Sequence, residues 1–271
     1  MAAWTLDDIA WARFDKTKLD PEIVRIVKAA SLVEHNGAAY AHHLCRIFAD
    51  DPQFQETARR WGEEEIRHGV ALARWASLAD PAFDFAQAFA RFQAGFEVDF
   101  DSDISRRGSR AGEMVARCVV EIGTSSYYTA LREGAAEPVL QEICRHIAAD
   151  ELRHYRLFYK QLERLQANEP IGRLARLRIA LGRVAESEDD ELAYAYYAAN
   201  DSGCPYDRKR CTGDYARRAL ALYRPHHVER GVAMLLKAVG VTPNRRLGLL
   251  ASRLAWRAMR LRAGRLSKMA A

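Results

Sequence analysis

The chain has 271 residues, of which 49% are hydrophobic and 28% charged, the balance of a soluble globular protein. Its five cysteines are odd in number and widely scattered, which argues against a disulfide framework. No apolar run approaches the roughly 20 residues that span a bilayer, and Asp7 and Asp8 interrupt the beginning of the chain. We therefore expect a cytoplasmic protein, with peripheral attachment at the inner membrane face as an alternative.

Charge divides the chain into two parts. Residues 1–170 carry 21 Lys and Arg against 27 Asp and Glu, whereas residues 171–271 carry 20 against 9. After Glu229 there are ten basic residues and no acidic one. This asymmetry predicts an acidic body over 1–170 and a basic helical extension over 171–271 that packs on it.

Helical spacing of apolar residues recurs along nearly the whole chain, and Pro and Gly fall at plausible helix boundaries. Asp20-Pro21 and Asp51-Pro52 are typical helix starts. The fold class is therefore predicted to be all-α. The expected helices cover about 20–48, 52–78, 83–96, 113–132, 139–167, 172–187, 189–199, 213–223, 226–239 and 245–266, with a loop at 200–214.

Each of four long predicted helices carries one Glu in the middle of an apolar stripe, and two of them add a His one turn later. Burying four carboxylates without a partner is very costly, and metal cations allow them to stay ionised. We therefore predict a metal site. Its candidate ligands are Glu34, Glu65, His68, Glu121, Glu151 and His154.

The ligand order is an internal repeat. Glu34 and Glu65 are 31 residues apart, and Glu121 and Glu151 are 30 apart, so two helix hairpins would bring the side chains to one level. Four carboxylates and two imidazoles suit two iron or manganese ions, the ligand pattern of ferritin-like di-metal bundles. Either Glu-x-x-His motif alone would more often be a solvated polar pair. Two such motifs, each preceded by a Glu about thirty residues earlier, favour a metal site.

Two segments resemble the soluble acyl-(acyl-carrier-protein) desaturases. "WGEEEIRHGVAL" (61–72) is similar to the Glu-Glu-x-Arg-His-Gly segment of that family, and "ICRHIAADELRHYRLFYKQLERL" (143–165) is similar to the matching helix. The resemblance covers about 20–167. It implies a ferritin-like four-helix bundle with additional C-terminal helices, and a catalytic Thr124 beside the oxygen-binding face.

The resemblance indicates the class of reaction better than it indicates the substrate. The chain is shorter than the plant desaturases, the region after 171 has no counterpart, and the ligand spacing also resembles that of bacterial aldehyde-deformylating oxygenases. We expect an O2-dependent di-iron oxidase or oxygenase, of desaturase or monooxygenase type, acting on an acyl or lipid-like substrate. Two iron ions are the expected cofactor, with manganese or a mixed pair as alternatives.

A different class fits the same ligands. A ferritin-like ferroxidase would bind and oxidise iron without an organic substrate. Thr124 and the Arg-His pairs at 67–68 and 153–154 favour the oxygenase class.

Several neighbours are expected to support the ligands. Asp150 would accept the free N–H of His68, and Glu64 would do the same for His154 unless it is a solvated charge. Trp61 lies one turn before Glu65, where it would relay electrons or simply pack in the core.

Arg67 and Arg153 are expected to form salt bridges that hold the carboxylates rather than to contact substrate.

Partners follow from what the sequence contains. No flavin or iron–sulfur motif is visible, so an external ferredoxin-like donor would supply electrons for O2 chemistry. Residues 245–268 place leucines beside arginines on a helix, which suits an acidic acyl carrier protein, an anionic membrane surface or plain solvation. Nucleic acid is not expected, since Trp256 is the only aromatic residue among these basic residues. A homodimer is also considered.

Overall fold

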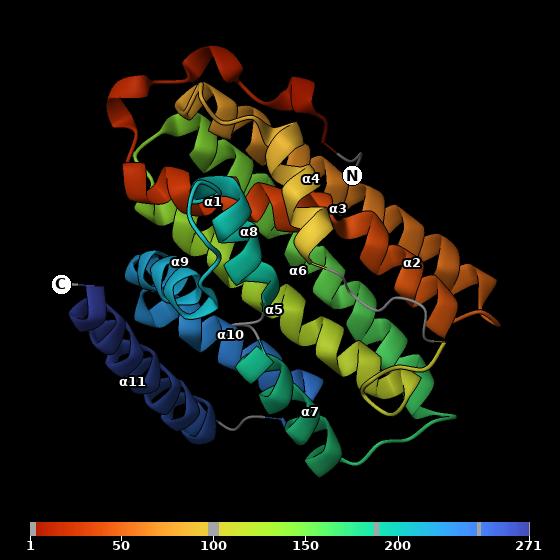
Figure 1. Ribbon diagram of the computed structural model, residues 1–271. Helices are drawn as coiled ribbons and strands as arrows, with labels where there is room; N and C mark the ends of the chain where they lie inside the picture. Colours follow the sequence, from red (N-terminus) through yellow and green to blue (C-terminus); the bar gives the residue numbers. More distant parts are fainter. Residues whose placement is uncertain (1–3, 97–102, 187–189, 243–244, 271) are drawn as a thin grey trace. The chain divides into compact units, whose positions relative to one another are not determined.

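The computed structural model describes residues 4–96, 103–186, 190–242 and 245–270 (Figure 1). Within these ranges the regular structure consists of helices, without a strand, which confirms the all-α fold class and is consistent with a helical bundle. None of the helices in this part of the chain is long and apolar enough to cross a bilayer.

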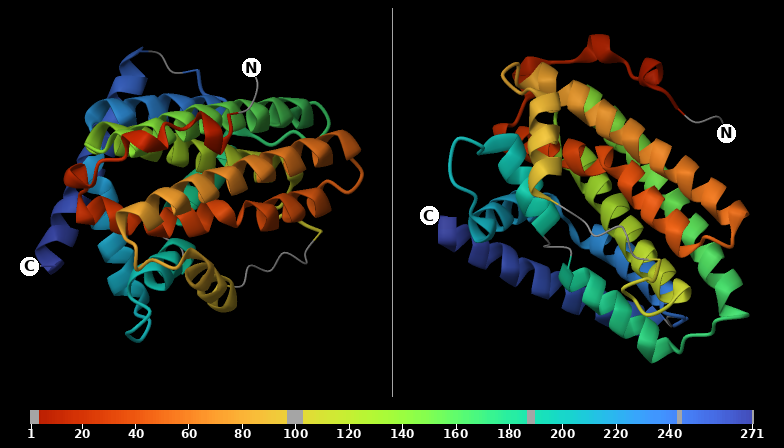
Figure 2. Two further views of the ribbon diagram at one scale, coloured as in Figure 1. Left: turned by 90° about the horizontal axis from the view of Figure 1, so that it is seen from above. Right: turned by 45° about the vertical axis from the view of Figure 1, so that its right-hand side comes forward.

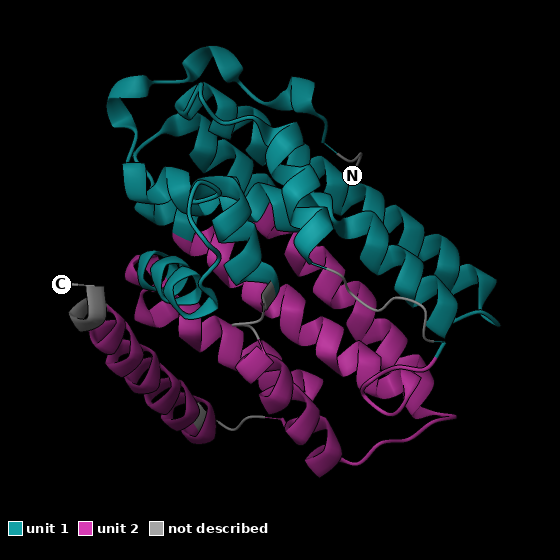
Figure 3. Ribbon diagram, viewed as in Figure 1, with its two compact units in different colours: residues 1–103, 131–146, 188–219 teal, residues 104–130, 147–187, 220–271 magenta. Residues whose placement is uncertain are grey.

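Two compact units interleave along the chain (Figure 3). Unit 1 comprises residues 1–103, 131–146 and 188–219, and unit 2 comprises the remainder. Helices α5 (Arg110–Gly134) and α6 (Pro138–Gln166) contribute residues to both. The division predicted at residue 170 follows composition rather than these contacts, and it stays a prediction.

In unit 1, α1 (Pro21–His35) and α2 (Gly37–Ile47) both pack along α3 (Pro52–Ala79) (Figure 2). The Asp-Pro starts behave as expected, since the Asp20 carboxylate accepts a hydrogen bond from the Glu22 N–H and that of Asp51 accepts one from the Phe54 N–H.

The single helix predicted over 20–48 is wrong. Asn36 leaves the helical conformation, with φ −79° and ψ 5°, and separates α1 from α2. The reason is close packing, because a Cβ on Gly37 would overlap the Cβ of Glu65 on α3. The break therefore lies where the chain approaches a candidate ligand.

Two later elements complete unit 1. Helix α8 (Asp190–Asn200) packs on α1 and on α4 (Phe85–Gly95). Helix α9 (Arg208–Leu222) begins inside the loop predicted at 200–214, so the expected start at 213 is wrong. Asp207 accounts for the earlier start, because its carboxylate accepts a hydrogen bond from the Arg210 N–H as an N-terminal cap does.

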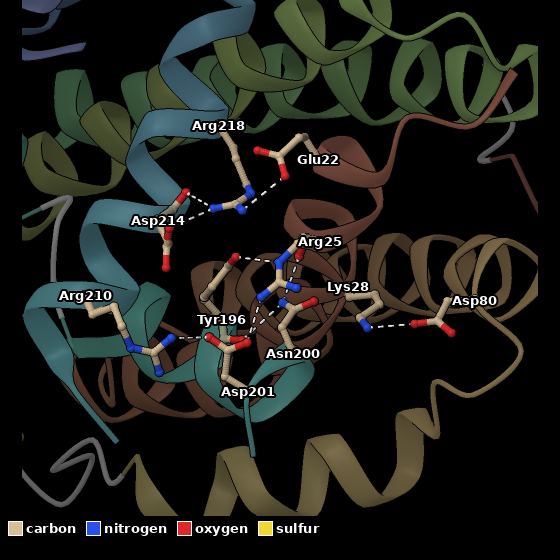
Figure 4. A network of polar contacts seen from close by, with 10 residues as sticks. All are labelled: Glu22, Arg25, Lys28, Asp80, Tyr196, Asn200, Asp201, Arg210, Asp214 and Arg218. Atoms are coloured by element: carbon tan, nitrogen blue, oxygen red, sulfur yellow. Dashed lines mark hydrogen bonds and ion pairs between the residues drawn. The ribbon is translucent and has the colours of Figure 1, made fainter. Parts of the chain in front are cut away.

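A polar network fastens α8 and α9 to α1 (Figure 4). Arg25 donates to the Tyr196 hydroxyl and to the Asp201 carboxylate, both at 2.7 Å. Asp201 also accepts from Arg210 at 2.8 Å, and the Asn200 amide donates to the Arg25 carbonyl at 3.0 Å. Residues from the predicted basic extension are thus tied to a helix that carries a candidate ligand.

In unit 2, α5 and α6 run antiparallel, because Glu121, Thr124 and Ser125 along α5 contact His154, Glu151 and Ala148 of α6 in the reverse order. Helix α10 (Pro225–Ala238) packs on α6, where the Tyr155 hydroxyl donates to the Met234 carbonyl at 3.0 Å. Helix α10 also packs on α11 (Arg245–Ala270), and α7 (Arg173–Glu186) belongs to the same unit.

Candidate metal centre

Unit 1 contains the first cluster of candidate ligands. Glu34 lies in the last turn of α1, and Glu65 and His68 lie one turn apart on α3. The His68 Nδ1 atom is 3.4 Å from a Glu34 carboxylate oxygen and 3.8 Å from one of Glu65. All three side chains are almost completely enclosed, and His68 has no exposed surface.

Two glycines bring these ligands together. Gly37 allows α2 to contact α3 at Glu65, and Gly69 does the same for the end of α1. A Cβ on Gly69 would lie 2.5 Å from the backbone nitrogen of His35, next to Glu34. Neither approach is possible with a larger side chain unless the helices move apart.

Unit 2 contains the second cluster, with the same composition. Glu121 lies on α5, and Glu151 and His154 lie one turn apart on α6. The His154 Nδ1 atom is 3.6 Å from a Glu121 oxygen and 3.7 Å from a Glu151 oxygen, and each of the three side chains is only 1% exposed.

Thr124 stands beside this second cluster. It follows Glu121 on α5, and its hydroxyl donates a 2.8 Å hydrogen bond to the Glu151 carboxylate on α6. The same hydroxyl lies 3.3 Å from the Val120 and Glu121 carbonyls. Thr124 therefore contacts a candidate ligand directly.

The donor sets of both clusters fit a transition-metal cation. In each one, two carboxylates and an imidazole offer atoms within 4.8 Å of one another. Metal–ligand bonds of about 2 Å place neighbouring ligand atoms about 3 to 4 Å apart, which matches these distances better than hydrogen bonds of about 2.8 Å do. Carboxylate and imidazole together suit iron and manganese.

Comparison with known families decides the class of the chain. A family model described as fatty acid desaturase matches residues 34–181, more than half of the sequence. The chain belongs to the fatty acid desaturase family. No curated protein matches the sequence. The matched range begins at Glu34 and includes all six candidate ligands, and membership suggests a desaturase- or hydroxylase-like lipid oxidase.

In this member of the fatty acid desaturase family, the pKa of the Glu121 carboxyl is strongly perturbed. Burial, together with the nearby Glu151 carboxylate, raises the pKa of Glu121 well above its usual range. A cation between the two carboxylates would favour the ionised form instead. The two carboxylates of the second cluster would therefore favour a bound cation.

The structure gives contacts for the residues predicted to support the ligands, although with arginines rather than histidines. Asp150 is buried, and its carboxylate accepts a hydrogen bond from Arg153 at 2.5 Å. Glu64 lies 3.9 Å from Arg67. Both arginines thus stand beside carboxylates, whereas the expected pairs Asp150–His68 and Glu64–His154 join residues of different units and stay predictions.

Trp61 is buried on α3, one turn before Glu65, and its relay role stays a prediction.

Trp4 is a site residue that sequence reasoning missed. Its buried ring stacks on the His68 imidazole, with 6.0 Å between centroids and 3° between planes. The Arg67 guanidinium lies 5.2 Å from the centroid of the Trp4 ring, and the centroid of the His146 ring lies 5.1 Å from it. No local pattern marks Trp4, because it lies in an irregular segment 64 residues before His68.

Proposed function

We propose that this fatty acid desaturase family member is an O2-dependent di-iron oxidase or oxygenase acting on an acyl or lipid-like substrate. The observation that carries the proposal is the pair of matched clusters, each with two buried carboxylates and an imidazole. Family membership supports lipid oxidation, and Thr124 on Glu151 supports oxygen chemistry over simple iron storage.

We further infer that the two clusters hold one pair of metal ions. The support is the sequence, in which the 31-residue and 30-residue intervals and the Glu-x-x-His motifs repeat as in ferritin-like di-metal bundles. Two iron ions are proposed, with manganese or a mixed pair as alternatives. When bound, such ions supply the O2 activation that oxidation of an unactivated C–H bond requires.

The protein's own residues have three tasks in this scheme. The carboxylates and imidazoles bind and orient the metals, and the Thr124 hydroxyl positions one Glu151 oxygen while holding a proton at Oγ1. Fully buried Met114, Cys118 and Phe158 provide apolar surroundings in unit 2 that exclude water. Electrons would come from an external ferredoxin-like donor.

The proposal is tested by metal analysis of Glu121→Ala and Glu151→Ala after iron loading. Each variant should lose at least one of the two irons of the wild type, because a buried ligand is removed. Glu163→Ala is the matched control, since Glu163 is an exposed carboxylate on the same helix as Glu151. Retention of two irons by either ligand variant would overturn the site assignment.

A substrate experiment separates the oxygenase from a ferroxidase. The iron-loaded protein with a reductant should consume O2 faster when fatty acyl substrates are present, and oxidised acyl products should appear by mass spectrometry. Turnover with ferrous iron as the only substrate, or assembly into a large multi-subunit cage, would favour the ferroxidase instead.

A further inference from the structure

Helix α11 exposes a stripe of leucines along much of its length. Leu247, Leu250, Leu254 and Leu261 are between 44% and 60% exposed. At 3.6 residues per turn these four positions fall within an arc of about 60° on the helix. The opposite side of α11 packs on α10 and includes the buried Ser252. The leucine stripe therefore points away from the helix that supports it.

Arginines line one border of this stripe. Arg246, Arg253, Arg257 and Arg260 are all exposed and follow the adjacent arc of the helix. The sequence contains no acidic residue after Glu229, so the charge along α11 is of one sign. A strip of leucine beside a strip of arginine is typical of helices that lie in the interface of an anionic bilayer.

Helix α7 of the same unit has a similar surface. Leu174, Leu177, Leu181 and Val184 are exposed at spacings of three, four and three residues. Arg173 and Arg178 are exposed beside them. A Cβ on Gly240 would lie 2.7 Å from an Arg176 guanidinium nitrogen, so α7 contacts the turn that follows α10. Unit 2 thus exposes two basic, leucine-rich helices.

We propose that α11 and α7 bind the surface of an anionic lipid bilayer. Leucines spread along an entire helix can all enter the acyl-chain boundary of a bilayer, while the neighbouring arginines contact lipid phosphates. A folded partner protein typically buries a patch with a hydrophobic core and a surrounding polar rim, whereas here the leucines and arginines run side by side along the helix. Peripheral attachment would place the protein next to lipids, and it goes beyond the oxidase function because it requires no metal.

The test is co-sedimentation of the full chain with vesicles of phosphatidylcholine alone or mixed with phosphatidylglycerol. Wild type should bind the anionic vesicles, and high salt should weaken that binding because ions screen the arginines. Leu250→Glu/Leu254→Glu should weaken it about tenfold or more. Leu78→Glu is the matched control, since Leu78 is a partly exposed leucine of α3 in unit 1, and it should leave binding unchanged.

A second variant keeps the test informative if Leu250→Glu/Leu254→Glu misfolds. Arg253→Gln/Arg257→Gln removes two exposed charges without touching packed side chains, and it should weaken anionic binding about tenfold while reducing its dependence on salt. Equal weak binding to both vesicle types would overturn the proposal. Binding to an acidic carrier protein without vesicle binding would also overturn it, as would a dimer that Leu250→Glu/Leu254→Glu converts to monomers without vesicle binding.

Discussion

At the scale of single residues, a hydrogen-bond donor and an aromatic ring lie directly against the candidate ligands. Thr124 fixes one oxygen of Glu151, and Trp4 covers His68. Neither residue would need to bind a metal ion in order to affect it, because the orientation of a ligand influences both the affinity for the metal and its reactivity.

Replacing Thr124 by Val removes the donor to a buried carboxylate, a loss of about 1 to 3 kcal/mol at that group. We expect iron content to persist while turnover falls about tenfold, since a 1.4 kcal/mol change corresponds to a factor of ten. Thr124→Ser keeps the hydroxyl and should retain most activity. Iron analysis and steady-state rates on all three proteins check this, and equal rates for Thr124→Val and wild type would contradict it.

Replacing Trp4 by Ala opens a cavity over His68, and we expect unfolding free energy to fall by about 3 to 5 kcal/mol, as for other buried aromatic residues. Chelators should also remove iron faster, because the imidazole becomes accessible. Trp4→Phe should be intermediate in both measurements. Urea unfolding and chelator kinetics provide the readouts, and chelator rates identical to those of wild type would show that Trp4 does not shield the site.

At the scale of elements, the candidate ligands of unit 1 meet because helices approach each other closely at glycines. The break between α1 and α2 and the contact of Gly37 with Glu65 occur at the same place. The polar network of Figure 4 also fixes the positions of helices in unit 1, because it holds α8 and α9 on α1. Helix placement in unit 1 thus rests on a few specific contacts.

Gly37→Ala tests this directly. The new methyl group would overlap Glu65, so we expect about 1 to 3 kcal/mol of destabilisation and weaker iron binding. Gly182→Ala is the control, because Gly182 is a helical glycine with open space around it and should gain up to about 1 kcal/mol. Thermal unfolding of both variants gives the comparison, and equal stability for them would refute the close-approach explanation.

The contact between α1 and the end of α3 predicts a dependence on pH. Lys28 donates a 2.9 Å hydrogen bond to Asp80 and thereby lowers the pKa of that carboxyl. A lowered pKa in the folded state stabilises the protein above the ordinary Asp value, and this contribution disappears as pH falls through the lowered value. Asp80→Asn should therefore lower the free energy of unfolding by about 1 kcal/mol at pH 7. Chemical denaturation of both proteins measures this difference, which should vanish in strong acid.

At the scale of the whole molecule, local patterns predicted the helices well because apolar spacing and Asp-Pro caps are local signals. The break at Asn36 was not predictable, since the apolar stripe continues across it and its cause is the contact of Gly37 with another helix. The segment before residue 20 also lacked a signal. It is held by distant partners, including Glu142, which accepts from the Ala10 N–H, and Glu137, which accepts from the Asp15 N–H.

The candidate ligands were predictable for a different reason. Helical periodicity places each Glu and His on an apolar face, so their burial follows from sequence alone, and the two clusters form within units as those faces require. The chain's interleaved units were not predictable, because they depend on which helices exchange contacts over long separations.

The central proposal, which rests on the repeated ligand intervals of the sequence, is that the two clusters together hold one pair of interacting metals. Mössbauer and electron paramagnetic resonance spectra of the iron-loaded protein test this most directly. We predict two irons per chain whose spins couple, with the coupled signal lost in both Glu65→Ala and Glu121→Ala. Isolated mononuclear iron, or a coupled signal that survives either substitution, would contradict it.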